Sequence, residues 1–258
     1  MKNAIIYTLA FVVINLIAST IVEGISLLIA GQSEPITSTK LIIMAVLSSL
    51  TTIGVFIFLK WADVSRRYLL TRPWGVVFWC AIAAFGVLIP SLCLQEAMPE
   101  LPNLMSSEFE MIMGERWGYL AIGILAPIAE ELVFRGAVLR ALLRWNRTNH
   151  WVSIGFSALA FALVHANPAQ MPHAFLTGLL LGWLYYRSGS IIPGVAFHWV
   201  NNSIAYIMYN LYPDPDIRLI DVLGSQRSVA AAFVFSLFIL LPALFQLNLL
   251  LKRAPTHQ

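Results

Sequence analysis

Residues 117–144, with the sequence WGYLAIGILAPIAEELVFRGAVLRALLR, form a stretch that is long and apolar enough to cross a membrane as a helix. Three ionisable side chains, Glu130, Glu131 and Arg135, lie in its interior. A charged side chain inside a span costs about 2.5 to 3.5 kcal/mol on insertion scales and marks a candidate functional site. This stretch therefore predicts both a membrane-spanning helix and the position of a site.

The composition of the whole chain is that of a membrane protein. Of its 258 residues, 59% are hydrophobic and 11% are charged, whereas soluble domains have about 25% charged residues. This is too little charge to cover a soluble globule, and the chain is too apolar to be disordered. A net charge of +3 without a basic cluster excludes nucleic acid as a predicted partner. The lipid bilayer is the expected environment.

Apolar stretches recur along the chain. They predict an all-α, polytopic membrane protein, a bundle of about eight transmembrane helices. The expected spans are 4–29, 41–59, 74–95, 117–144, 151–166, 172–187, 190–210 and 227–251. Pro90 is expected to kink or end the third of them. We find no tandem repeat or linker, so residues 1–258 are predicted to form a single membrane domain.

The basic residues predict an orientation, because loops on the cytoplasmic side are rich in Lys and Arg. With the N-terminus inside, the inner segments carry 11 Lys and Arg residues and the outer segments 4, and Arg135 within a span completes the 16. The inner set is Lys2, Lys60, Arg66, Arg67, Arg72, Arg140, Arg144, Arg147, Arg187, Lys252 and Arg253. We therefore expect a multi-pass protein of the plasma (inner) membrane with both termini in the cytoplasm.

Helical spacing assigns different environments to the two adjacent glutamates. Glu131 and Arg135 are four residues apart, the spacing of an ion pair on one helix face. Glu130 diverges from Arg135 by about 140° around the helix axis. We therefore expect Arg135 to neutralise Glu131 and to leave Glu130 without a partner on its own helix. A carboxylate in that position is a candidate general acid or base.

Other polar side chains lie in later spans at comparable depth. His165 closes the fifth span, and His198 and Asn202 are four residues apart on the seventh, where they can form one polar patch. At about 1.5 Å per residue, Glu130 and His165 both lie about 21 Å from the cytoplasmic helix ends. His198 and Asn202 lie about 12 and 18 Å from that side. Convergence of the three helices into one site is therefore feasible.

Three short motifs follow one another in these spans: Glu130-Glu131-x3-Arg135, Phe161-x3-His165 and His198-x3-Asn202. Their order and spacing resemble the motifs of the CPBP family, the CAAX-protease and bacteriocin-processing membrane proteins, also called Abi. Type II CAAX prenyl endopeptidases belong to this family. The resemblance covers a motif-bearing core at about residues 117–210. It implies an intramembrane endopeptidase that acts on a peptide or protein substrate in or at the membrane.

The resemblance also implies roles for the motif residues. Glu130 and His165 are expected to activate a water molecule. His198 and Asn202 are expected to stabilise the tetrahedral oxyanion, and the Glu131–Arg135 pair supports the site. No cofactor is required on this interpretation. Zinc is the alternative, because Glu130, His165 and His198 could bind Zn²⁺ with an open position. The His-Glu-x-x-His signature is absent, which favours the metal-free interpretation.

Two other functions agree with intramembrane polar residues. One is a non-proteolytic immunity or adaptor protein that keeps the fold and binds its partner without cutting it. The other is a proton- or ion-coupled transporter. Inverted internal repeats would support a transporter, and we see none.

Three further features have less specific interpretations. His173, at a span boundary, is expected to be an ordinary interfacial residue. The pair Gly178-x3-Gly182 is expected to allow close helix packing. Glu23, in the first span, has no assigned role.

Overall fold

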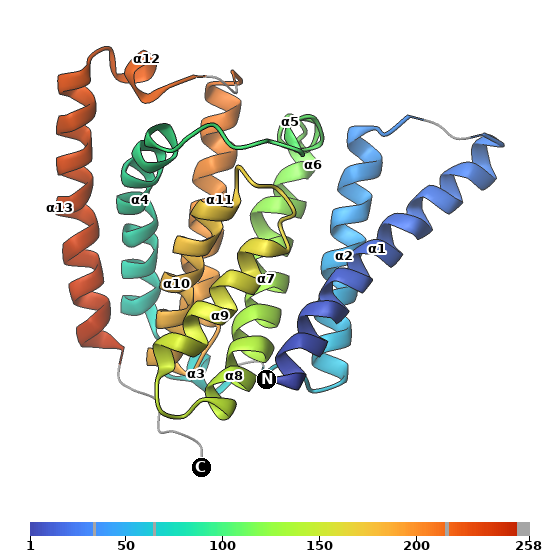
Figure 1. Cartoon of the computed structure of the whole chain (residues 1–258), viewed down its shortest axis with the longest axis horizontal. Coiled ribbons are helices and arrows are strands. Elements are labelled where there is room, and N and C mark those ends of the chain that lie inside the picture. The colour runs from blue at the N-terminus through green and yellow to red at the C-terminus, as the bar shows by residue number, and fades with distance from the viewer. Residues whose placement is uncertain (33–34, 64–65, 215–216, 252–258) are drawn as a thin grey trace.

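The computed structural model describes residues 1–32, 35–63, 66–214 and 217–251, with only the backbone at 66 and 67. Helix is the only regular secondary structure in these ranges, which confirms the all-α fold class (Figure 1). Lys252 and Arg253 of the predicted inner set lie outside the described residues, as do the side chains of Arg66 and Arg67.

Every predicted span overlaps a helix. The long single helices are α1 (Lys2–Ala30), α2 (Ser38–Phe58), α4 (Trp74–Ala97), α9 (His150–Leu163), α10 (Met171–Ser188), α11 (Ile192–Leu211) and α13 (Gln226–Leu250). The fourth span is one continuous rod made of α6 (Arg116–Gly118), η1 (Tyr119–Leu125), α7 (Ala126–Glu131), η2 (Leu132–Leu139) and α8 (Arg140–Trp145). Short helices in the connections are α3 (Arg66–Leu70), α5 (Ser106–Met113) and α12 (Leu219–Leu223).

Two details differ from the expected boundaries. The fifth span ends at Leu163 instead of 166, because the chain turns at Ala166 with a φ of 51°, so His165 lies in this turn and not in the helix. Helix α4 continues through Pro90 to Ala97, so Pro90 does not end it.

The outer and inner helices of the bundle differ in how much of each helix is buried inside the protein. Among the described residues, α1, α2, α4 and α13 are long and apolar enough to cross a membrane. Helices α1 and α13 are also the least buried of these, with 11% of their most apolar windows buried. The inner rod is the opposite case, because all eight residues of η2 are buried. An inner helix contacts protein instead of lipid and can therefore carry charged residues.

The bundle has two buried clusters on either side of α10. One contains Phe56, Phe134 and Phe161 and joins α1, α2, η2 and α9, and the other joins α4, α11 and α13. Gly178 and Gly182 bring α10 against α9. A Cβ at these positions would lie 3.0 Å from Ala158 and 2.8 Å from Ile154, so the predicted close packing is confirmed. The start of α1, α8 and the end of α13 lie at one end of the bundle (Figure 1).

Candidate active site

The rod that carries Glu130 and Glu131 has wide π-helical turns on both sides of them. Such turns are rare and occur frequently at functional sites. In η1 the Ala126 N–H bonds to the Ala121 carbonyl, five residues back. The next bond in this pattern would need the N–H of residue 127, which is a proline and has none. The Ile122 carbonyl is therefore free to accept a hydrogen bond from the Asn202 side chain at 3.1 Å.

Glu131 and Arg135 form the ion pair that their spacing predicts. Arg135 donates to Glu131 Oε1 at 2.8 Å, and neither side chain is exposed. Arg135 also donates to the Gly178 carbonyl at 3.3 Å and lies over the Phe161 ring, 4.4 Å from its centroid. These contacts tie the rod to α9 and α10 and hold Glu131 in one orientation.

His198 lies between the two adjacent carboxylates. Its Nδ1 is 3.3 Å from Glu131 Oε1, and its Nε2 is 3.6 Å from Glu130 Oε2. Glu130 was expected to have no partner on its own helix, and the structure supplies one from α11 instead. The two carboxylates differ in access, because the side chain of Glu130 is 20% exposed and that of Glu131 is fully buried. Glu130 is the carboxylate that water or substrate can reach.

His165 joins this group through the ring of Phe161. Its Nδ1 is 2.8 Å from the Phe161 carbonyl, and the two rings meet edge to face at 4.9 Å. The same phenyl ring meets His198 edge to face at 5.8 Å. Within the described residues, no hydrogen bond or ion pair joins His165 to Glu130. Phe161 is therefore the common contact of the three motifs, a role that its place in a motif did not reveal.

Asn202 lies one turn along α11 from His198 and is held at both ends of its amide. Its Nδ2 donates to the Ile122 carbonyl, and its Oδ1 accepts from Asn201 at 3.5 Å. A primary amide nitrogen has two N–H donors, so one remains for another acceptor. His198 and Asn202 therefore contact the rod at two levels, near Glu130 and near Ile122.

His173 is more closely integrated than an ordinary interfacial residue. Its Nδ1 forms a short hydrogen bond with Ser91 of α4, and its Nε2 lies 3.4 Å from the Thr177 hydroxyl. The four-residue spacing of His173 and Thr177 was the available signal in the sequence, because it places both on one helix face.

The predicted zinc ligands do not form a metal-binding group in this arrangement. In the described part of the chain, no three His, Cys, Asp or Glu side chains are grouped so that they could hold a metal ion. Both ring nitrogens of His198 face carboxylates, and Nδ1 of His165 faces a backbone carbonyl. The residues present thus do not fit the predicted zinc site. The metal content of the active protein stays a prediction.

Gly194 of α11 makes room for the buried carboxylate of Glu131. A Cβ at this position would lie 2.4 Å from Glu131 Oε2, an atom with no hydrogen-bond partner among the described residues. We expect Gly194→Ala to lower the free energy of unfolding by about 1 to 3 kcal/mol, because the carboxylate or α11 must move. Thermal unfolding of the purified protein measures this effect.

The matched control is Gly155→Ala in α9, where an added Cβ meets nothing within 4 Å. That change is expected to leave the unfolding temperature unchanged or to raise it, because alanine favours helix. Equal unfolding temperatures for the two variants would contradict the close approach of Gly194 to Glu131.

The segment that contains all three motifs matches a family of known proteins. Residues 113–204 match the model of the family described as type II CAAX prenyl endopeptidase Rce1-like. The family is one of proteases, and together with the long apolar helices the match identifies an integral membrane protein.

A curated relative supports this result. The UPF0177 protein YxdF of Lactococcus lactis subsp. lactis (strain IL1403) is 24% identical over 154 residues, which cover 56% of this chain and 79% of that protein. No solved structure matches the chain.

Proposed function

We propose that this protein is an intramembrane endopeptidase that hydrolyses peptide bonds of membrane-associated or hydrophobic substrates. The observation that carries the proposal is the gathering of the three motifs around Phe161, with Glu130 as the accessible carboxylate. The match of this same region to the Rce1-like family supports it. The expected location is the plasma (inner) membrane, with both termini in the cytoplasm.

Glu130 is the proposed general base. It must take a proton from a water molecule as that water attacks the scissile carbonyl, and then pass this proton to the amine that leaves when the C–N bond breaks. Its partial exposure allows the water to approach. Glu131 is unsuited to this role, because it is buried and bound to Arg135. Its proposed function is to orient His198 from the opposite ring nitrogen.

His165 is proposed to hold the same water from a second side. When Nδ1 donates its proton to the Phe161 carbonyl, Nε2 carries the free lone pair and accepts a hydrogen bond. The ring contact with Phe161 fixes the plane of the imidazole. The water would then lie between Glu130 and His165, which have no direct bond to each other within the described residues.

His198 and Asn202 are proposed to stabilise the oxyanion. Asn202 offers its second amide N–H, and the Nε2 side of His198 faces Glu130, where the reacting carbonyl would lie. Each of these steps is assigned to a side chain of this protein. Measuring the metal content of the active purified protein tests whether a zinc ion also takes part in the reaction.

Asn202→Ala is expected to lower kcat by about 10²- to 10³-fold with a smaller change in KM, because an oxyanion donor acts mainly in the transition state. Steady-state kinetics on a cleaved peptide measure both constants. The matched control is Asn210→Ala on the same helix, since Asn210 also donates to a backbone carbonyl, that of Met113. A similar loss of kcat in both variants would show that Asn202 has only an anchoring role.

Cleavage itself is tested with the full chain in lipid nanodiscs and two peptides of the same sequence, one with a farnesylated C-terminal CAAX motif and one unmodified and hydrophobic. Mass spectrometry of the products is expected to show one new pair of fragments from at least one peptide, and the pair locates the scissile bond. Binding of both peptides without fragments, extended to a library of hydrophobic peptides, would contradict the proposal and favour an immunity or adaptor protein.

A further inference from the structure

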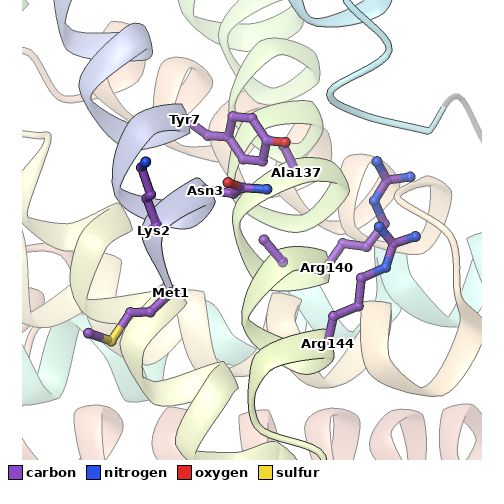
Figure 2. A pocket seen from close by; sticks show the side chains of 8 residues that line it. Met1, Lys2, Asn3, Tyr7, Ala137, Arg140 and Arg144 are labelled. Carbon is purple, nitrogen blue, oxygen red and sulfur yellow. The ribbon is translucent and has the colours of Figure 1, made fainter.

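A polar pocket of about 250 Å³ lies far along the rod from Glu130, between the first turns of α1 and the end of the rod. Met1, Lys2, Asn3 and Tyr7 line one wall, and Ala137, Arg140, Ala141 and Arg144 line the other. Figure 2 shows Asn3 and Tyr7 of α1 next to Ala137 of the rod, with the long side chains of Arg140 and Arg144 extending from the rod on the side away from Lys2. The second wall is one helix face at spacings of three and four residues, and its two alanines leave the space open.

The chemistry of the lining is that of an anion site. Lys2, Arg140 and Arg144 contribute positive charge, and none of the lining residues is acidic. Arg140 donates to the Trp61 carbonyl at 2.9 Å, which fixes its guanidinium. Within the described residues, Lys2 and Arg144 form no ion pair, and the Tyr7 hydroxyl forms no hydrogen bond. Arg140 and Arg144 are four residues apart and repel each other, so a bound anion would stabilise both.

The surroundings of the pocket favour an anion that belongs to a lipid. Helix α1 leads directly from the pocket into a strongly apolar surface, where the exposed fractions of Ile5 and Leu9 are 52% and 56%. This surface fits lipid chains. The start of α1 and α8, which contribute to the lining of the pocket, lie at one end of the bundle (Figure 1), where headgroups are expected. Basic pockets between transmembrane helices at a membrane surface are typical sites for anionic headgroups.

We propose that this pocket binds the phosphate of an anionic phospholipid headgroup. Arg144 and Arg140 would bind the phosphate oxygens, and Tyr7 and Asn3 would donate from the facing wall. The lipid would thereby join α1 to the rod that carries Glu130, because these two elements form the two walls of the pocket. The proposal concerns binding and stability and does not depend on peptidase activity.

The experiment is thermal unfolding of the full chain in detergent micelles at rising concentrations of dioleoylphosphatidylglycerol, with dioleoylphosphatidylcholine and sodium phosphate as separate arms. Phosphatidylglycerol is expected to raise the unfolding temperature, and the other two are not. Arg144→Gln is expected to raise the half-saturating lipid concentration about fivefold, the usual contribution of one basic residue near an anionic surface. An equal effect of sodium phosphate would overturn the assignment to a lipid.

Two variants separate the pocket from general attraction to positive charge. Arg147→Gln removes an exposed arginine that follows Arg144 by three residues in the sequence and does not line the pocket, and it is expected to leave lipid binding unchanged. Ala141→Phe fills the pocket without changing the charge, and it is expected to weaken binding as Arg144→Gln does. If Arg144→Gln and Arg147→Gln shift the half-saturating concentration equally, the pocket is not the lipid site.

Discussion

Glu130→Gln is expected to lower kcat/KM for peptide cleavage by about 10²- to 10⁴-fold, the usual contribution of a positioned general base. The amide keeps the size of the side chain and cannot accept the proton of the attacking water. Stability should change little, because this side chain is partly exposed and its ion-pair partner, His198, is 3.6 Å away. The measurements are initial cleavage rates in nanodiscs and the unfolding temperature of the same samples.

Glu23→Gln is the matched control for this variant. It makes the same chemical change in another predicted span, where Glu23 lies 4.0 Å from Lys40 and contacts none of the three motifs in the described structure. Its cleavage rate is expected to equal that of the wild type. Wild-type cleavage by Glu130→Gln would remove Glu130 from the mechanism, and an equal loss in both variants would indicate a general effect on the membrane fold.

The helices were predictable because lipid restricts the possible structures. A segment within a bilayer must satisfy its own backbone hydrogen bonds, so an apolar stretch such as residues 74–95 can be assigned to a helix by length alone. The boundary at residue 166 was wrong because a turn with a positive φ at Ala166 leaves no such signal. The Glu131–Arg135 pair was predictable for a related reason, since both residues belong to one helix.

Contacts between helices were much less predictable. Depth along each span indicated that the motifs could meet, but it could not show that His198 would lie between two carboxylates or that Phe161 would contact all three motifs. These contacts depend on which helices are neighbours and on how each is rotated. The π-helical turns around Glu130 and the space that Gly194 leaves for Glu131 depend on the same packing.

Arg135→Met is expected to lower the free energy of unfolding by about 3 to 5 kcal/mol, the usual cost of removing one partner of a buried ion pair. It leaves the fully buried carboxylate of Glu131 without its cation and the Gly178 carbonyl without a donor. The measurements are the unfolding temperature and the fraction of monodisperse protein after purification. Arg218→Met is the control, because Arg218 is 64% exposed and its ion pair spans 4.0 Å, so the expected cost is at most about 1 kcal/mol.

The double variant Glu131→Leu with Arg135→Met separates the structural role of this pair from its effect on the reaction. It leaves no unpaired charge in the core, so much of the lost stability is expected to return. Cleavage is not expected to return, because His198 then has Glu130 at one ring nitrogen and no carboxylate at the other. Recovery of both stability and wild-type cleavage would show that Glu131 does not orient His198. An unfolding temperature of Arg135→Met equal to that of the wild type would contradict the buried pair itself.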